Sequence, residues 1–388
     1  MRASRPRRLV VLGSTGTIGE QTLELARRNP DRVAVVGLAA GSNASRLARQ
    51  AAEFTPEAVA VGNAGALPEL ERQRGATGGA ELLAGEEGLC RLAAWPGAEI
   101  VVNAVVGAAG LRPTLAALEA GGRLGLANKE SLVMAGPLVR AAAARGGSEI
   151  IPIDSEHSAL WQLLQGRDPG EVHRLLLTAS GGPFRTFTSE QLARVTPEQA
   201  LRHPTWTMGR RITIDSATLF NKGMELIEAR WLFDLPLERI EAVVHPQAVV
   251  HGLVELIDGS TLAQLSRPDM RLPIQLALSL PIRWPAADVR WHWGSGTALC
   301  FEPVDEERFP CLGIARAAGE AEGIAPAVVN AADEILVEAF LDGRISFPAI
   351  AEGLAAVLQQ HDPVPDPSLV DILAADAWAR RAVGEWLP

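Results

Sequence analysis

The chain has 388 residues, of which 47% are hydrophobic and 21% charged, and its formal net charge is −10 at pH 7. This composition is typical of a globular protein rather than a disordered one, and the length predicts two or three domains. No apolar run reaches the roughly 18 residues of a membrane-spanning helix, and the basic residues are scattered, so we expect neither a membrane-spanning nor a nucleic-acid-binding protein.

The chain begins with a short basic arm, followed by an apolar run at residues 9–12. Such an arm is similar to the start of a signal peptide, but the run stops at Gly13 and no cleavage-type site follows it. We therefore expect a first strand here and a cytoplasmic protein. The cysteines have no C-x-x-C spacing and are expected to be buried or incidental thiols; they are Cys90, Cys300 and Cys311.

Residues 1–149 alternate short Val/Ile/Leu runs with Ala-rich helical segments. This alternation predicts a doubly wound α/β domain with a parallel, Rossmann-like sheet. The expected strands cover residues 8–12, 32–39, 58–61, 99–105 and 123–127, and the expected helices include residues 20–28, 44–53 and 111–120.

A Gly-rich turn, Gly13-Ser-Thr-Gly-Thr-Ile-Gly19, follows the first expected strand and opens the first expected helix. In this position backbone N–H groups can approach a pyrophosphate, although a tight turn without a ligand is the alternative. After the second strand, residues 39–43 contain no acid to repel a 2′-phosphate, and Arg46 is nearby, which favours NADP over NAD. Asn128-Lys-Glu130 follows the fifth expected strand, at the edge where ligands of such folds bind, unless it is a solvated loop.

A second region, residues 150–280, mixes expected strands at 174–178, 242–244 and 261–264 with amphipathic helices, and is predicted to be an α+β domain. We take it to begin near residues 149–154. Residues 281–310 are rich in Pro, Trp and Gly, which is typical of a connector. Residues 311–388 consist largely of helix formers and predict a small helical bundle.

Asp154 and Glu156 stand two positions apart at the end of an apolar strand, and a period of two directs both side chains to one side. Hard oxygen ligands suit Mg²⁺ or Mn²⁺, and no cysteine lies nearby to favour zinc. The alternative is that Asp154 or Ser155 caps a helix at residues 155–164, with Glu156 favourable to its dipole.

Asn221, Lys222 and Glu225 have i, i+3 and i, i+4 spacing, which places them on one face of an expected helix. The same helix continues into an apolar run, which favours burial over the alternative of a solvated Lys–Glu pair. A second Gly-rich turn, Ser180-Gly-Gly-Pro-Phe-Arg185, follows the strand at 174–178 and could wrap an anion.

Trp206 lies between Pro204 and Gly209, which is more typical of a mobile lid, over residues 189–211, than of a helix face. His203 lies in the same segment. Taken alone, His203 and His251 could each be satisfied core histidines.

These motifs closely resemble those of the 1-deoxy-D-xylulose 5-phosphate reductoisomerase family, in order and over essentially the whole chain. The matching segments are residues 13–19, 128–131, 154–159, 180–185, 203–210, 215–225, 245–252 and 375–380. The resemblance implies conversion of 1-deoxy-D-xylulose 5-phosphate to 2-C-methyl-D-erythritol 4-phosphate with NADPH and Mg²⁺ or Mn²⁺, the committed step of the non-mevalonate isoprenoid pathway. It also implies a homodimer that is inhibited by phosphonates of the fosmidomycin type. A related NADPH oxidoreductase acting on another sugar phosphate, or a non-catalytic NADPH-binding sensor, is the alternative.

The resemblance also assigns the site residue by residue. It implies that the metal ligands are Asp154, Glu156 and Glu225, with Lys129 and His203 as further catalytic residues. The implied substrate contacts are Lys129, Ser155, Glu156, Ser180, His203, Trp206, Ser216, Asn221, Lys222 and Glu225. The implied NADPH contacts are Gly13, Thr15, Gly16, Thr17, Ile18, Gly41, Ser42, Asn43, Asn128, Glu130 and Gly209. Thr17 replaces a usual Ser, and Ser42 stands where some members carry Lys, which leaves the contact to the 2′-phosphate open.

Overall fold

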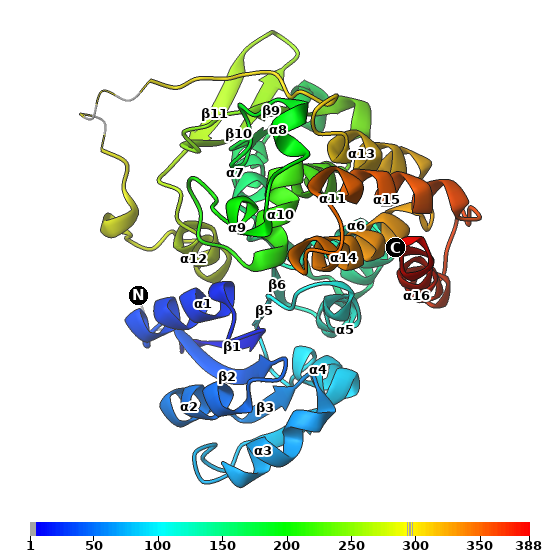
Figure 1. Cartoon of the computed structure of the whole chain (residues 1–388). Helices are drawn as coiled ribbons and strands as arrows, with labels where there is room; N and C mark the ends of the chain where they lie inside the picture. Colours follow the sequence, from blue (N-terminus) through cyan, green and yellow to red (C-terminus); the bar gives the residue numbers. More distant parts are fainter. Residues whose placement is uncertain (1–4, 293, 295, 297) are drawn as a thin grey trace. The chain divides into compact units, whose positions relative to one another are not determined.

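The computed structural model describes residues 5–292, 294, 296 and 298–388 (Figure 1). Residues 1–4 of the expected basic arm lie outside this description. The chain forms two compact units, and neither is a continuous stretch of sequence. Unit 1 consists of Met1–Ser131, Pro137–Ser158 and Asp269–Val289, and unit 2 consists of Leu132–Gly136, Ala159–Pro268 and Arg290–Pro388.

Unit 1 contains a seven-stranded sheet with the strand order β4-β3-β2-β1-β5-β6-β7, in which all neighbours pair in parallel. This confirms the predicted doubly wound α/β fold. The side chains of Leu9 to Leu12 are fully buried, as expected for a parallel strand covered on both faces. The strands are β1 Arg7–Leu12, β2 Val33–Ala40, β3 Ala58–Val61, β4 Glu81–Ala84, β5 Ile100–Asn103, β6 Arg123–Leu126 and β7 Glu149–Pro152.

Two strands of this sheet differ from the sequence-based expectation. β4 was not predicted. β7 was assigned to the start of the second region, but it pairs with β6 as the seventh strand of the first sheet. The helices that follow these strands are α1 Thr17–Arg28, α2 Ala44–Phe54, η1 Ala64–Ala66, α3 Leu67–Arg72, α4 Gly85–Ala93, η2 Ala108–Gly110, α5 Leu111–Ala120, α6 Lys129–Gly146 and α7 Ser155–Leu164. Residues of α6 and α7 belong to both units.

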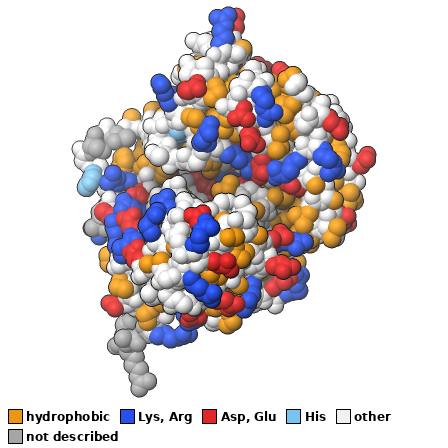
Figure 2. Space-filling view, turned by 60° about the horizontal axis from the view of Figure 1, so that its bottom comes forward, with side chains coloured by type: hydrophobic (Ala, Val, Ile, Leu, Met, Phe, Trp, Pro, Cys, Tyr) orange, Lys and Arg blue, Asp and Glu red, His pale blue; other side chains and the backbone are white. Residues whose placement is uncertain are grey.

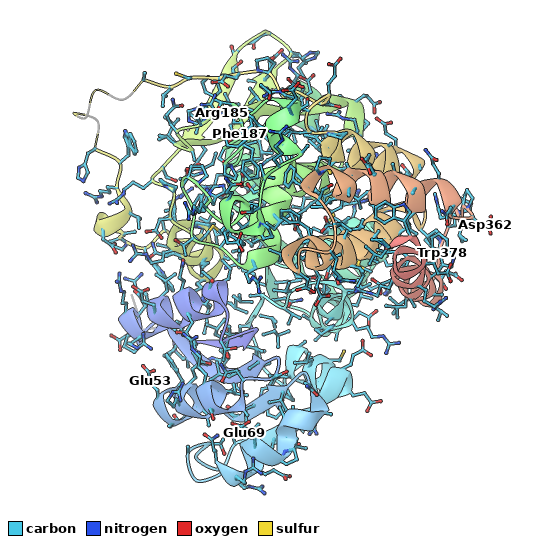
Figure 3. The ribbon with its side chains drawn as sticks, in the orientation of Figure 1. Glu53, Glu69, Arg185, Phe187, Asp362 and Trp378 are labelled. Atoms are coloured by element: carbon cyan, nitrogen blue, oxygen red, sulfur yellow. The ribbon has the colours of Figure 1, made fainter. Side chains whose placement is uncertain are left out.

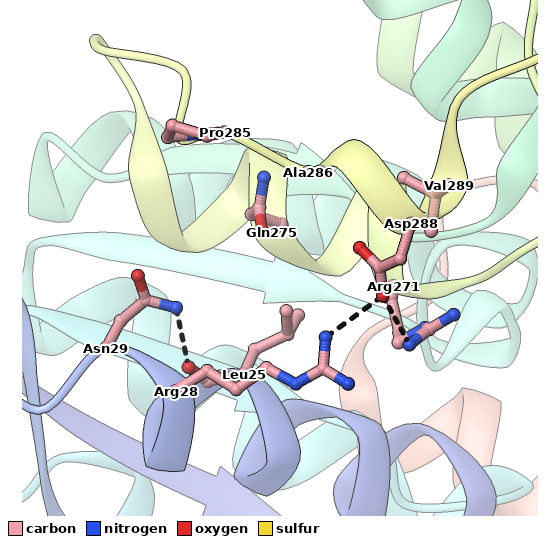
Figure 4. A pocket seen from close by; sticks show the side chains of 9 residues that line it. All are labelled: Leu25, Arg28, Asn29, Arg271, Gln275, Pro285, Ala286, Asp288 and Val289. Atoms are coloured by element: carbon pink, nitrogen blue, oxygen red, sulfur yellow. Dashed lines mark hydrogen bonds and ion pairs between the residues drawn. The ribbon is translucent and has the colours of Figure 1, made fainter.

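A late segment of the chain, Asp269–Val289, also packs in unit 1. It contains α12 Arg271–Ser279 and the short helix η5 Ala287–Val289. The guanidinium groups of Arg28 and Arg271 both donate to Asp288, at 3.0 and 2.9 Å (Figure 4). The first part of the predicted connector at 281–310 is therefore a packed part of unit 1, not a free linker.

Unit 2 contains a four-stranded mixed sheet with the order β11-β10-β8-β9, in which only β8 and β9 pair in parallel. Its strands are β8 Val172–Ala179, β9 Ile240–Val244, β10 Val250–Leu256 and β11 Thr261–Leu265; β10 was not predicted. The helices of this part are η3 Pro169–Glu171, α8 Ser189–Leu192, α9 Pro197–Ala200, α10 Arg210–Thr218, α11 Phe220–Phe233 and η4 Leu237–Arg239.

The C-terminal part is helical, as predicted, and belongs to unit 2. Its helices are α13 Cys311–Ala321, α14 Ala325–Leu341, α15 Phe347–Gln360 and α16 Leu369–Trp386. α13 packs closely on α11, because a Cβ added at Gly223 would lie 2.4 Å from the Cβ of Ala315.

The described helices include none that is both long and apolar enough to cross a membrane. Figure 2 shows Lys and Arg side chains interspersed with Asp and Glu side chains on the face that it presents. The three cysteines are free thiols; Cys311 is buried, and burial raises the pKa of its thiol.

Candidate active site

The turn after β1 is compact because of its glycines. Gly13 has a φ of +81°, and a Cβ added there would lie 2.4 Å from the carbonyl oxygen of Ala104, in the loop after β5. A Cβ added at Gly19 would lie 2.3 Å from the carbonyl oxygen of Gly13. β1 and β5 are neighbours at the point where the strand order reverses, which is where ligands of such folds bind.

The N-terminus of α1 faces this turn with backbone groups. Gly16 is the N-cap residue, and no described side chain makes a capping hydrogen bond to the helix. The first N–H groups of a helix without such a cap are suited to an anion. Within the turn, Thr15 and Ile18 are half-buried and Gly16 and Thr17 are exposed.

The residues after β2, Gly41 to Asn43, are exposed. Asn43 caps α2, its Oδ1 accepting from the backbone N–H of Arg46 at 3.0 Å. Ser42 Oγ accepts from Asn63 Nδ2 at 3.4 Å. The sequence reasoning missed Glu20, whose carboxylate lies 2.8 Å from Nε of Arg46. The guanidinium expected to favour a 2′-phosphate therefore already has an acidic partner from α1.

Asn128 and Glu130 order the loop after β5, so the solvated-loop alternative is wrong. Asn128 is 1% exposed, and its Nδ2 donates to the carbonyl oxygens of Val105 and Gly107 at 2.8 and 3.0 Å. Glu130 Oε1 accepts from the N–H of Gly107 at 3.0 Å. A Cβ added at Gly110 would lie 2.4 Å from the Asn128 side chain. This segment is therefore built into the carboxyl edge of the sheet.

Asp154 lies between β7 and α7 and is paired with Lys129, with 2.5 Å between Nζ and Oδ2. Both side chains are largely buried: that of Lys129 is 10% exposed and that of Asp154 is 17% exposed. The carbonyl of Asp154 accepts the first helical bond, from the N–H of Ser158, so the capping alternative describes its backbone correctly. Its carboxylate has the further role of neutralising Lys129.

Glu156 lies in the first turn of α7 and accepts a 2.5 Å hydrogen bond from Ser155 Oγ. β7 ends at Pro152, so the prediction that Asp154 and Glu156 share one strand face is wrong. His157 was not predicted as a site residue. It is fully buried, with Nδ1 3.9 Å from Oδ2 of Asp154. Its i, i+3 spacing from Asp154 at a helix start could have indicated this proximity.

Glu225 is buried in unit 2 together with its neighbours on α11. Asn221 Nδ2 and Lys222 Nζ both donate to its carboxylate. Glu225 is 1% exposed and Lys222 is 4% exposed, so the alternative of a solvated Lys–Glu pair is wrong. A buried carboxylate is stable only when it is paired or bound to a cation. Lys222 already supplies one positive partner to the Glu225 carboxylate, so this carboxylate lies in a site that accepts positive charge.

The second Gly-rich turn carries a hydroxyl that is oriented by His203. The backbone N–H groups of Thr205 and Trp206 donate to His203 Nδ1 at 3.1 and 2.9 Å, so the proton of the neutral ring lies on Nε2. Burial lowers the pKa of His203, which favours this neutral form. Nε2 lies 3.0 Å from Ser180 Oγ, which also accepts from the N–H of Gly182. The hydroxyl proton of Ser180 is therefore free to be donated elsewhere.

Trp206 is half-buried and lies outside any helix, as predicted. Its ring centroid is 6.4 Å from that of His251, which is only 5% exposed, as the core alternative for that residue expects. Gly209 is the N-cap residue of α10, and Ser216 is half-buried on the same helix. A Cβ added at Gly182 would touch the carbonyl oxygen of Ser216 at 3.0 Å, so the second turn rests on α10.

Comparison with known proteins identifies the relatives of this chain. A family model described as 1-deoxy-D-xylulose 5-phosphate reductoisomerase matches residues 9–136, and two C-terminal domain models of the same enzyme match residues 150–233 and 265–382. The chain belongs to the 1-deoxy-D-xylulose 5-phosphate reductoisomerase family. The reductoisomerase of Pelotomaculum thermopropionicum is 50% identical, over 96% of both chains. That of Symbiobacterium thermophilum is 51% identical, over 97% of this chain and 98% of its own.

Solved structures of reductoisomerases have the same fold. The enzyme of Zymomonas mobilis in complex with NADPH is 42% identical, covers 98% of this chain and 99% of its own, and gives a TM-score of 0.92. A reductoisomerase in complex with NADPH, fosmidomycin and magnesium is 40% identical, covers 98% of each chain, and gives a TM-score of 0.93.

Within each unit, several of the residues implied by the reductoisomerase resemblance lie together. Unit 1 groups Lys129 with Asp154 and Asn128 with Glu130. Unit 2 groups Ser180 with His203, and Asn221 and Lys222 with Glu225. Since Asp154 and Glu156 belong to unit 1 and Glu225 to unit 2, their joint role as metal ligands stays a prediction.

Proposed function

We propose that this chain converts 1-deoxy-D-xylulose 5-phosphate to 2-C-methyl-D-erythritol 4-phosphate with NADPH as reductant, as a cytoplasmic homodimer, in the non-mevalonate isoprenoid pathway. The observation that carries this proposal is the identity of about half of all residues, over nearly the full length, with proteins of that name. The presence of all three expected acids, each partly or fully buried, supports it further over a non-catalytic sensor.

NADPH would bind at the turn after β1. The two glycines at which a Cβ would overlap backbone atoms, Gly13 and Gly19, allow a close approach to the N-terminus of α1. Asn128 and Glu130 hold the adjoining loop after β5, and Gly41 to Asn43 lie exposed after β2 for the ribose end. The structure of the Zymomonas mobilis enzyme in complex with NADPH supports this choice of cofactor.

A divalent cation, Mg²⁺ or Mn²⁺, would be held by Asp154, Glu156 and Glu225. Carboxylate oxygens are the ligands that these hard cations prefer. When bound, the ion supplies Lewis-acid polarisation of the substrate's carbonyl and hydroxyl oxygens. Lys129 forms an ion pair with Asp154, one of these ligands, and its ammonium would contact a substrate hydroxyl. Lys222 and Asn221 orient the Glu225 carboxylate by donating to it.

The substrate's phosphate would be held in unit 2 by donors from the turn after β8 and from α10 and α11. His203 donates through Nε2 to Ser180 Oγ, so the Ser180 hydroxyl proton would be available to the phosphate. Ser216, Asn221 and Lys222 would supply the remaining donors from α10 and α11. We further propose that residues 189–211 close over the substrate, or over a phosphonate of the fosmidomycin type, with Trp206 covering it.

The test measures NADPH oxidation and its dependence on a divalent metal. Purified protein should oxidise NADPH in the presence of 1-deoxy-D-xylulose 5-phosphate, lose this activity in EDTA, and regain it on addition of Mg²⁺ or Mn²⁺. A protein that binds the sugar phosphate but consumes no NADPH with either metal would overturn the proposal.

The metal assignment has its own test in Glu225→Gln. Removal of one anionic ligand should weaken metal binding and lower turnover by about 100-fold or more. Each tenfold loss corresponds to about 1.4 kcal/mol of transition-state stabilisation. Glu228→Gln is the matched control, because Glu228 is equally buried, at 1% exposed, on the same helix. Equal losses in the two variants would mean that Glu225 acts only as a buried acid.

A further inference from the structure

Residues 300–308, which the sequence predicts as part of a connector, contact the second Gly-rich turn at several points; we call this segment the strap. Its backbone joins the sheet of unit 2: Val244 and Glu302 exchange two backbone hydrogen bonds of 2.9 Å, forming an antiparallel bridge at the end of β9. His245, which follows the last residue of β9, donates its backbone N–H to the carbonyl oxygen of Ala179 at 2.7 Å. Ala179 directly precedes the turn. The strap therefore lies one strand away from Ser180.

The start of the strap is fixed by the buried ring of His245. The ring nitrogen Nδ1 lies 2.8 Å from the carbonyl oxygen of Cys300. The ring also stacks on Phe301, with 4.7 Å between centroids and 19° between planes. Gln247 Oε1 accepts from the N–H of Cys300 at 3.2 Å. These contacts and the bridge at Glu302 hold three successive residues of the strap.

Two side chains of the strap hold the turn from its far end (Figure 3 labels Arg185 and Phe187). Both carboxylate oxygens of Glu302 accept from Nη1 of Arg185, at 2.7 and 2.6 Å. Arg308 donates to the carbonyl oxygens of Arg185 and Phe187, at 3.3 and 2.6 Å. Asp305 in turn pairs with Nε of Arg308 at 2.7 Å.

The Arg185 side chain passes this constraint on to the glycines. A Cβ added at Gly181 would lie 2.7 Å from Cδ of Arg185, so the arginine stem packs directly against the Gly181 backbone. Gly181 and Gly182 both have positive φ, of +82° and +66°. Two successive glycines have large conformational freedom when unrestrained, and that freedom would misplace the N–H groups that surround an anion.

A separate contact, made by Phe184, anchors the loop independently of the ion pair. Phe184 is 1% exposed and packs against Phe187 and Phe347, with centroid distances of 5.1 and 5.3 Å. By contrast, the Arg185 and Glu302 side chains are 35% and 42% exposed, so their pair contributes little to global stability. A change in the placement of the turn can thus be separated experimentally from a loss of global stability.

We infer that Glu302 is a positioning residue for phosphate binding: through Arg185 it holds Gly181 and Gly182 so that the N–H groups of the turn and the hydroxyl of Ser180 are preorganised for the substrate's phosphate. This inference rests on the proposed role of Ser180 in the binding of the sugar phosphate. Preorganisation acts on binding rather than on the chemical step, so its loss raises KM and leaves kcat nearly unchanged.

The test compares Glu302→Ala with Glu241→Ala. Glu241 forms a similar exposed pair with Arg174 at the other end of β9, with two bonds of 2.9 and 3.0 Å and side chains 35% and 44% exposed. Glu302→Ala should raise the KM for the sugar phosphate about tenfold, with KM for NADPH, kcat and Tm close to wild type. Glu302→Gln, which keeps an acceptor for Arg185, should recover most of the affinity, and Glu241→Ala should leave it unchanged.

A double variant and a measurement without turnover complete the design. The double variant, Arg185→Ala with Glu302→Ala, should raise the KM for the sugar phosphate by no more than the larger of the two single substitutions does. Both residues act through one ion pair. Amide hydrogen exchange over residues 180–187 should become faster in Glu302→Ala than in Glu241→Ala, whatever the substrate. Unchanged exchange, or equal KM changes in the two alanine variants, would overturn the inference. Faster exchange in an enzyme that does not turn over the sugar phosphate would instead refute the proposed function and leave the strap's positioning effect standing.

Discussion

The two Gly-rich turns of this chain follow strands in different units, and they keep their shape by different means. The turn at residues 13–19 depends on its own glycines, because a Cβ at Gly19 would overlap the carbonyl of Gly13. The turn that begins at Ser180 is held from a distance, by an ion pair between residues 117 positions apart. The first turn is therefore closed by backbone packed on backbone, within the turn and against Ala104, and the second by a side-chain ion pair.

This difference predicts how each turn responds to change. A turn closed by backbone packing has little tolerance for an added Cβ at its glycines. A turn fixed by distant side chains can be loosened gradually, without a substitution in the site itself. The following experiments test this contrast, from the largest expected effect to the smallest.

Gly19→Ala should break the first turn. The new Cβ would lie 2.3 Å from one backbone atom and 2.5 Å from another, in Gly13 and Ser14, so the turn must shift. We expect about 2–3 kcal/mol of lost binding, which is roughly a 100-fold rise in the Kd of NADPH, measured by fluorescence titration. Gly75→Ala is the control, because no described atom lies within 4 Å of a Cβ there and its φ is not positive. An unchanged Kd in Gly19→Ala would contradict the closure of this turn by backbone packing.

Trp206→Ala tests the environment of the second turn. Trp206 is half-buried in the segment that also carries His203, so we expect weaker binding of a fosmidomycin-type phosphonate, by about tenfold, with little change in Tm. Trp284→Ala is the comparison, because Trp284 is 7% exposed in unit 1 and its loss should cost about 3–5 kcal/mol of stability. If Trp206→Ala melts as far below wild type as Trp284→Ala does, Trp206 is a structural residue and not part of a lid.

The stability contributed by the contact between α10, on which the second turn rests, and α14 should depend weakly on pH. α10 is joined to α14 by Arg211, whose Nη2 lies 3.2 Å from Oδ2 of Asp333. Burial raises the pKa of Asp333 to about 6 from an ordinary value of 3.8, against the opposing effect of Arg211. Between these two pH values the folded protein binds this proton more tightly than the unfolded chain does, so the stability contributed by Asp333 falls as the pH rises.

Asp333→Asn imitates the protonated form and should remove this pH dependence. The Tm of the variant minus that of wild type should rise by a few degrees as the pH is raised from about 4 to about 7, since only the wild type pays for ionisation. Glu352→Gln, which removes an exposed carboxylate of α15, controls for the loss of one charge. A Tm difference that stays constant with pH would show that Asp333 does not titrate in this range.

Features set by nearby residues were predictable from the sequence. The helix expected at residues 111–120 is α5, with the same bounds, because its apolar spacing is a local property. The spacing of Lys222 and Glu225 correctly placed both on one helix face, and the apolar run that follows correctly indicated their burial. The glycine spacing after β1 was likewise informative, since the close approach lies within the turn itself.

Features set by distant contacts were not predictable in this way. β7 has the composition of a strand, but the identity of its partner, β6, depends on tertiary pairing. The strand-like period at Asp154 and Glu156 failed because the chain changes from strand to helix between Pro152 and Ser155. The ion pair between Arg185 and Glu302 leaves no local signal, because each residue alone is an ordinary half-exposed charge.

One short segment, Asn128 to Glu130, has a thermodynamic consequence. Asn128 and Glu130 are bonded to the loop beside the cofactor turn, while Lys129 between them is paired with Asp154. The proposed cofactor contacts thus flank the partner of a proposed cation ligand, and a change that one ligand makes in this segment reaches the site of the other. Such coupling is reciprocal: the factor by which NADPH alters the affinity for Mg²⁺ must equal the factor by which Mg²⁺ alters the affinity for NADPH. A factor above one would mean that each ligand promotes binding of the other, and a factor below one that each opposes it.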